Sequence, residues 1–414
     1  MLILARNRPR STDDAKRCGE RGQSLLIFAL FVVPAFLAVG VATVDVGLWQ
    51  GERRGAQKDA DLSALAGAYG LLTNPQDANA VQAKAQQYQQ INDEAGNAAI
   101  IGNVQVDNSC FHTTWLDSVT LNVSHASRTF FGNAFGIKIA PDIGAHARAC
   151  MGSPDTATGL MPIGVQVTGF NSDCFQPDPA NPSGPEIPVF GQYCELAFGA
   201  GTQTSGEGGL LRLFDDGSLN CSAPNTGGGQ TTQNELSSGG ADTTCAVAPP
   251  GTTSADCVSG VNYCVWPKTQ AGGTNPIQQS IQTLLSTEGQ CDSLFGNHDG
   301  IDDWLEVVQA TNGDPNPAPG TTTFARRACT SPRLVSLIII QSFSEQGNGP
   351  APILAFATFF IQGCVNSGTV YRTCDIQGGG SGQTSLYGFF MNILNVGSLG
   401  PPNNYGQRAI ALVE

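Results

Sequence analysis

The sequence lacks the motifs that establish an enzyme. It has no G-x-S-x-G, H-E-x-x-H, G-x-x-x-x-G-K-[ST] or helix-opening G-x-G-x-x-G pattern, so hydrolase, zinc protease and nucleotide-binding chemistry have no local signature. Its four histidines stand apart without a metal-ligand spacing: His112, His125, His146 and His298. We therefore expect a protein without catalytic activity, and a secreted hydrolase is the least favoured function.

Paired cysteines at metal-binding spacing are also absent, because no C-x-x-C occurs among the 13 cysteines. Cys18 lies near the amino terminus, and the other cysteines all lie between Cys110 and Cys374. An even number of cysteines in one region indicates disulfides formed in an oxidising compartment. Free buried thiols are the alternative interpretation, and the sequence leaves the connectivity open.

Charge is scarce and unevenly spread. Charged residues make up 13% of the chain, and the net charge is −14. Residues 1–23 carry six basic and three acidic groups, a net +3, which leaves −17 for the remainder. An acidic domain repels phosphate, so nucleic acid is not an expected partner. The 51 glycines and 24 prolines favour β-structure with long loops over a helical bundle.

No charged residue occurs from Ser24 to Val44. About 20 apolar residues suffice to cross a bilayer, so this run predicts a transmembrane helix over 24–44 that ends at Asp45. Trp49 lies where an interfacial aromatic is expected. The positive-inside rule makes residues 1–23 a cytoplasmic tail and places the main domain outside the cytoplasm. A cleavable signal peptide, cut near Gly40–Ala42, is the alternative.

Residues 45–99 predict a helical extension followed by a second helix, which opens at Asn74-Pro75. Residues 100–414 predict a β-rich extracytoplasmic region, with a Gly/Ser/Thr-rich, disulfide-tied insertion at about 215–273. The fold class expected is therefore α+β: an amino-terminal transmembrane helix with a helical extension, then a β-rich, disulfide-containing domain with long loops. Leu334–Ile340 and Ile353–Ile361 are the most apolar strand candidates after the membrane run.

A stripe of small residues follows the apolar run, with Thr43, Gly47, Gly51 and Gly55 recurring every four residues. Such a stripe lets helix backbones approach closely, so it predicts packing against another helix or a second copy of the chain. Because each glycine costs a helix about 1 kcal/mol relative to alanine, a frayed helix is the alternative interpretation.

One acidic cluster suggests calcium. In a twelve-residue loop register, ligand positions 3, 5, 9 and 12 would be held by Asn297, Asp299, Asp303 and Glu306. Position 1 would be Phe295, which has no ligating atom. The favoured interpretation is therefore an Asp-Gly turn followed by a helix whose first turn carries Asp302 and Asp303. No cofactor is required, and calcium stays a hypothesis.

The amino-terminal stretch resembles the TadE/TadG-like proteins of tight-adherence (Flp) pilus assembly. About 50 residues carry the resemblance: Gly22-Gln23-Ser24, Pro34, Val44-Asp45-Val46-Gly47, Arg53-Arg54, Gln57, Asp61 and Ala64-Leu65-Ala66. TadG itself typically carries a von Willebrand A-like domain with a D-x-S-x-S metal site, which this sequence lacks. The fifth residue after Gly22 is Ile27 rather than glutamate, so processing by prepilin peptidase is not expected.

The resemblance implies a structural protein of the bacterial inner membrane that assembles or anchors an Flp-type pilus together with other pilus proteins. It implies no activity for residues 100–414. The alternative function is an extracytoplasmic adhesin or a calcium-dependent binding module.

Overall fold

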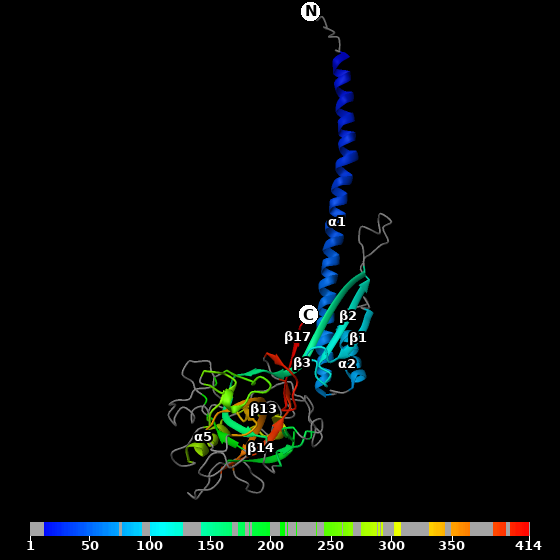
Figure 1. Cartoon of the computed structure of the whole chain (residues 1–414). Coiled ribbons are helices and arrows are strands. Elements are labelled where there is room, and N and C mark those ends of the chain that lie inside the picture. The colour runs from blue at the N-terminus through cyan, green and yellow to red at the C-terminus, as the bar shows by residue number, and fades with distance from the viewer. Residues whose placement is uncertain are drawn as a thin grey trace, which may run out of the picture. The chain divides into compact units, whose positions relative to one another are not determined.

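The structure is a computed structural model, and it contains one long helix, α1, and several β-sheets (Figure 1). The residues that it describes are 12–73, 77–92, 100–126, 142–167, 173–178, 182, 184–198, 208–211, 213, 221, 237, 244–258, 260–267, 275–287, 289, 291–292, 302–307, 331–343, 349–364, 384–394 and 398–413. They form two compact units. The first comprises Met1–Ser63, Gln86–Val104 and Thr120–Ala147, and the second comprises Ala64–Ala85, Gln105–Val119 and Arg148–Glu414.

Helix α1 is a continuous helix of 62 residues, Thr12–Thr73, with Pro34 inside it. The prediction of a transmembrane helix over 24–44 is wrong, because in the described part of the chain no helix is long and apolar enough to cross a membrane. The charge-free run is instead an inner section of α1, whose ends lie outside the run on both sides. The predicted orientation, with the amino terminus in the cytoplasm, stays a prediction.

The carboxy-terminal half of α1 is packed, and small side chains make this possible. Ala56, Ala60, Ala64 and Ala68 recur every four residues, so they form one face, and all four are fully buried. Alanine costs no side-chain entropy in a helix, and its small volume lets neighbouring elements approach closely. The alanine-rich sequence therefore both favours the helix and supplies its packing face.

Helix α2, Ala78–Asn92, packs against the end of α1. A Cβ atom at Gly67 would lie 2.7 Å from Val119 Cγ1, so β2 approaches α1 too closely there for a side chain. One at Gly70 would lie 3.3 Å from Val81 Cα, a tight contact with α2. The helix begins later than Asn74-Pro75 predicts, because the carboxylate of Asp77 accepts the backbone N–H groups of Asn79 and Ala80.

A six-stranded sheet has the order β1-β2-β3-β17-β15, with β16 paired to β3. Its strands are β1 (Ile100–Asp107), β2 (Ser118–Ala126), β3 (Asp142–Pro154), β15 (Ile393–Leu394), β16 (Leu399–Gly400) and β17 (Gln407–Leu412). In β3, Ile143, Ala145 and Ala147 are buried and alternate with exposed residues, as a strand with one covered face requires.

The connection between β1 and β2 is held by a buried carboxylate and a disulfide. Asp117 accepts the backbone N–H groups of Cys110 and Phe111, and Cys110 is bonded to Cys150 in β3. Burial raises the pKa of Asp117 above its ordinary value, although both hydrogen bonds act in the opposite direction. This local network fixes the turn without presenting a reactive group.

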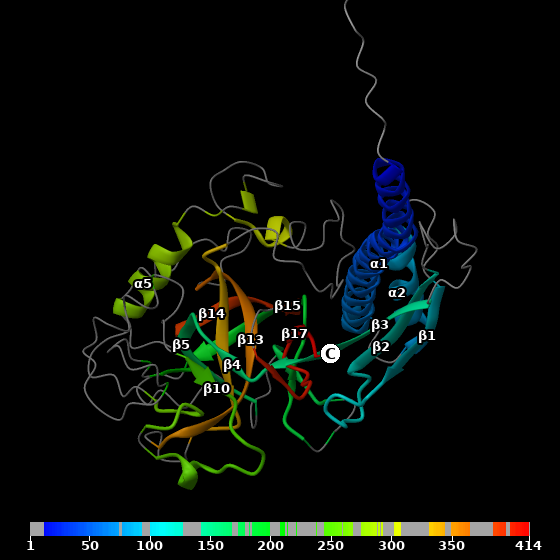
Figure 2. The same ribbon diagram turned by 90° about the horizontal axis from the view of Figure 1, so that it is seen from above.

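The second large sheet closes on itself. Its order is β11-β13-β12-β5-β9-β8-β14, and β14 also pairs with β13, beside which it lies in Figure 2. This pairing closes the strands from β13 to β14 into a ring, and β11 pairs with β13 outside the ring. The strands are β5 (Leu160–Gln166), β8 (Tyr193–Phe198), β9 (Gly208–Leu210), β11 (Cys264–Val265), β12 (Leu334–Ile340), β13 (Ala351–Gly363) and β14 (Thr384–Met391). Most pairs are antiparallel, but β12 runs parallel to β5.

Two apolar clusters lie on opposite faces of β12, which explains its uninterrupted apolar sequence. Val335, Leu337 and Ile339 belong to the cluster that also receives side chains from β5, β8, β13 and β14. Ile338 and Ile340 belong to a second cluster. Helix α5, Asn275–Leu285, adds Ile281, Leu284 and Leu285 to the first cluster. The prediction that Leu334–Ile340 forms a central strand is confirmed.

The smaller elements include two pairs of short strands and a short 3₁₀ helix. Strands β4 (Thr156–Ala157) and β10 (Cys245–Ala246) form one pair, and β6 (Phe175–Gln176) and β7 (Ile187–Pro188) form another. A 3₁₀ helix, η1, spans Ser254–Asp256.

The prediction of disulfides is confirmed. Besides Cys110–Cys150, bonds join Cys174 to Cys194, Cys221 to Cys245, and Cys257 to Cys264. Cys291 and Cys364 are disulfide-bonded as well. Two of the bonds, Cys221–Cys245 and Cys257–Cys264, lie within the predicted insertion at 215–273, so this polar stretch is tied to itself as expected.

Candidate functional site

The amino-terminal half of α1 exposes a large apolar surface. In Figure 1 this part of the helix extends away from β2 and β3. Large apolar side chains with more than half of their surface exposed occur at Leu26, Ile27, Phe28, Leu30, Phe31, Val33, Phe36 and Val39. Monomeric proteins rarely expose contiguous apolar patches of more than a few hundred Å² without a binding function. This stretch, residues 26–48, is called the apolar half of α1 below.

The predicted small-residue stripe lies on accessible helix surface. At Gly47, Gly51 and Gly55, an added Cβ atom would meet no atom within 4 Å. Another helix can therefore approach here without displacing any described residue of this chain. Asp45, between Thr43 and Gly47 in the sequence, is buried with 5% of its surface exposed. The role of the glycines in helix packing stays a prediction.

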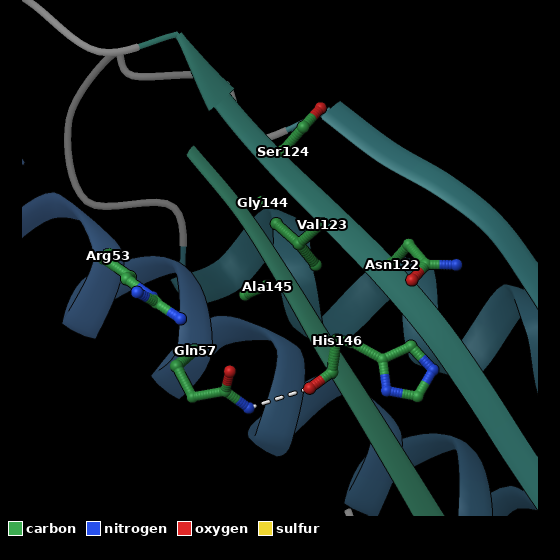
Figure 3. Close-up of a pocket in the computed structure, with 8 residues that line it drawn as sticks. All are labelled: Arg53, Gln57, Asn122, Val123, Ser124, Gly144, Ala145 and His146. Atoms are coloured by element: carbon green, nitrogen blue, oxygen red, sulfur yellow. Dashed lines mark hydrogen bonds between the residues drawn. The ribbon is translucent and has the colours of Figure 1, made fainter. Parts of the chain in front are cut away.

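Gln57 and Asp61 form the best-defined polar contact of α1. Gln57 Nε2 donates one hydrogen bond to Asp61 Oδ1 at 2.8 Å and a second to the backbone oxygen of His146 in β3 at 2.9 Å (Figure 3). Both partners are acceptors, so the amide nitrogen, and not its oxygen, must face them. Two residues of the TadE/TadG-like pattern thereby join the helix to the sheet.

A groove of about 470 Å³ opens beside this contact. It is lined by Arg53 and Gln57 from α1, Asn122 and Ser124 from β2, and Gly144 and His146 from β3 (Figure 3). Gly144 contributes no side chain, and a Cβ atom there would meet only the backbone oxygen of Val123, at 4.0 Å. The groove therefore reaches from α1 to the backbone of β3.

Along the groove, no strand that the structure describes pairs with one edge of β3. Strand β17 pairs with β3 over Ala149–Gly152 and a further backbone bond joins Val413 to Arg148, while β16 pairs with Ser153 and Pro154. Over Asp142–Ala147, none of the strands that the structure describes pairs with this edge. An unpaired strand edge carries a row of backbone donors and acceptors that another strand can use.

The predicted calcium ligands are only partly placed. Asn297 and Asp299 lie outside the described residues. Of the other two, Glu306 lies in a short helix over residues 304–307 and Asp303 directly precedes it. Glu306 accepts the backbone N–H of Asp303 at 2.7 Å, a capping contact. Asp302 accepts the N–H of Asp292. Among the residues that the structure describes, no three His, Cys, Asp or Glu side chains are close enough to hold a metal.

Two titratable side chains with strongly shifted pKa values, Tyr387 in β14 and Arg408 in β17, are packed within the sheets. Burial raises the pKa of Tyr387 to about 12, and a hydrogen bond and the charge of Glu195 add to this effect. Burial alone lowers the pKa of Arg408 to about 10. Tyr387 stacks on Tyr193, so its phenol is part of the sheet packing. Neither shift identifies an acid or base, and the absence of enzymatic activity stays a prediction.

Arg53, Gly144 and His146 were not predicted as site residues. The alternation of small buried residues with exposed ones at 142–147 predicts a strand with one covered face. It carries no sign of an open edge, because pairing depends on where β17 ends. Gln57 was singled out only through the family pattern.

Comparison with known proteins places the first part of the chain. Residues 22–70 match the model of the Tad family, described as Flp pilus-assembly TadE/G-like, and this range lies wholly within α1. No curated protein and no solved structure matches the chain. The match supports involvement in Flp pilus assembly and association with the cell envelope. The amino-terminal region of this chain, residues 22–70, is thus similar to the TadE/G-like proteins.

Proposed function

We propose that this protein is a structural component of an Flp-type pilus assembly system, and that α1 is the element that contacts other components. The observation that carries the proposal is the coincidence of two ranges. The TadE/G-like match covers residues 22–70, and the exposed apolar side chains lie between Leu26 and Leu48. The proposal gives the chain an assembly role and no catalytic one.

The chemistry of α1 supports contact with another apolar helix. Burial of apolar surface contributes about 25 cal/mol for each Å² removed from water, so a helix that exposes several phenylalanines gains by association. The open glycine face at Gly47, Gly51 and Gly55 supports a close backbone approach. The partner is another pilus-assembly protein or a second copy of this chain.

The disulfides support an extracytoplasmic place for the β-rich part. Ten of the cysteines that the structure describes are disulfide-bonded, and such bonds persist in oxidising compartments. In this proposal α1 contacts the assembly machinery, while the disulfide-linked sheets lie outside the cytoplasm. The acidic charge of the chain gives no support to a nucleic-acid partner.

The test is co-purification of the tagged full-length chain with pilus-assembly components. Replacing Phe28, Phe31 and Phe36 together with serine removes three exposed aromatic side chains without emptying the packed core. We expect co-purification to be lost while the thermal midpoint of the disulfide-linked part stays unchanged. Leu62→Ser is the control, because Leu62 is an exposed apolar residue in the other half of the helix.

Gly51→Leu tests the glycine face separately. The leucine side chain meets open space in the isolated chain, so only a helix packed closely on this face would be displaced. Unchanged co-purification for the triple serine variant would contradict the proposal. Loss for the serine variant with no effect of Gly51→Leu would keep the apolar contact and remove the glycine face from it.

A further inference from the structure

The backbone groups that point to the open edge of β3 can be identified from its contact with β17. In a strand, the N–H and C=O groups of alternate residues point to the same edge. The oxygen of Arg148 accepts a hydrogen bond from the N–H of Val413, at the end of β17, so this oxygen points to the β17 side. Two and four residues earlier, the backbone groups of His146 and Gly144 point to the same side, beyond the last paired residue of β17.

Gln57 already satisfies one acceptor on this edge. Its side-chain amide donates to the oxygen of His146, where the N–H of a neighbouring strand would donate in a complete sheet. Because Gln57 supplies a single donor where a strand would supply several, the neighbouring backbone groups of the β3 edge remain accessible through the groove. The contact shows that the edge accepts a donor from outside the sheet at this position.

The groove defines the chemistry of a strand that would fit. Arg53 is the formally charged member among the described side chains that line it, so a carboxylate on the α1 side of an incoming strand would be paired. On the other face, Gly144 leaves the β3 surface uncovered between Ser124 and His146 (Figure 3). A large side chain opposite this glycine would cover the exposed backbone, as aromatic residues do for glycines in sheets.

We propose that the edge of β3 over Asp142–Ala147 binds an extended segment of a partner protein by strand addition. The segment carries Asp or Glu facing Arg53 and a large apolar residue opposite Gly144. In strand addition, backbone hydrogen bonds supply affinity and alternate side chains supply specificity. This surface differs from the apolar half of α1, so either proposal can fail while the other holds.

Labelled peptides of about nine residues test the proposal against the purified full-length chain. The probe alternates threonine with glutamate and has one central phenylalanine, and a second probe has lysine in place of glutamate. A third repeats the first with N-methylated amides, which cannot donate to the edge. Fluorescence anisotropy measures binding, and hydrogen exchange of residues 142–147 locates it. We expect the glutamate probe to bind and protect these amides, and the N-methylated probe to bind at least about tenfold more weakly.

Three variants assign the contacts. Gly144→Pro removes the edge-facing N–H without touching the β2 side, so affinity for the glutamate probe should fall about tenfold. Arg53→Glu should weaken binding of the glutamate probe by a similar factor and strengthen binding of the lysine probe. Arg54→Glu is the matched control, since Arg54 is an exposed neighbour that does not line the groove, and it should change binding by less than about twofold. Thermal midpoints confirm that each variant is folded.

Two results would overturn the proposal. The first is equal binding of the glutamate and N-methylated probes, or no binding of either at about 1 mM, since strand addition requires the backbone donors. The second is protection of residues 142–147 that rises with protein concentration in the absence of peptide. That outcome would make a second copy of the chain the occupant of the edge.

Discussion

The two halves of α1 share one helical backbone but have opposite surroundings. From Leu26 to Leu48 the helix exposes large apolar side chains, whereas from Ala56 to Leu72 its buried face is mostly alanine and leucine. Glycine shows the difference most directly. A Cβ atom at Gly47, Gly51 or Gly55 would meet nothing, while one at Gly67 would clash with Val119. The same residue type is therefore a packing requirement in one half and a free surface in the other.

This difference identifies the half of the helix that packs against other parts of the chain. The carboxy-terminal half is tied to its surroundings by close contacts and by the hydrogen bonds of Gln57. In the amino-terminal half, the large apolar side chains from Leu26 to Val39 named above have more than half of their surface exposed, whereas Asp45 is buried. The carboxy-terminal half is stabilised within the chain, and the amino-terminal half is available to a partner.

Substitution of Gly67 is expected to have the largest effect. Gly67→Leu forces a side chain into the space held by Val119 and Ala85, and overpacking of this kind costs about 3 kcal/mol of unfolding free energy. Gly51→Leu in the other half is the matched control, because it meets open space. Urea denaturation of both variants measures the difference, and equal stabilities would show that the two halves are not distinct.

Changes at Gln57 come next. Gln57→Glu replaces a donor with a carboxylate that faces two acceptors, Asp61 Oδ1 and the oxygen of His146. We expect a loss of about 2 kcal/mol, compared with about 1 kcal/mol for Gln57→Leu, which only removes the two bonds. Arg54→Leu on the exposed surface nearby serves as the control. A glutamate variant as stable as the leucine variant would mean that the acceptors do not face residue 57.

How far the sequence predicts these features depends on how local each one is. The apolar sequence of β12 and the even number of cysteines can both be recognised without knowing which distant residues meet, and both predictions are confirmed. The bond from Gln57 to His146 joins residues 89 positions apart, and the open edge depends on where β17 stops, so no local pattern contains either.

The prediction of a transmembrane helix was wrong because a charge-free run does not define where a helix begins or ends. The second helix starts at Ala78, where the carboxylate of Asp77 accepts the backbone N–H groups of Asn79 and Ala80.

The smallest expected effect concerns the glycines of the open face, and it is a gain in stability, whereas the substitutions of Gly67 and Gln57 lower stability. Gly47→Ala, Gly51→Ala and Gly55→Ala each remove the backbone entropy of glycine from a helix interior without meeting another atom. Each should stabilise the helix by about 1 kcal/mol, seen as slower amide exchange between residues 45 and 57. Gly70→Ala is the control, since its Cβ atom would lie 3.3 Å from the backbone of Val81 and part of the gain would be lost.

If alanine at the open face slowed exchange yet weakened co-purification with pilus-assembly components, the glycines would be kept for a close helix contact rather than for flexibility. If it slowed exchange and left co-purification unchanged, the contact would lie on the phenylalanine side of the helix instead.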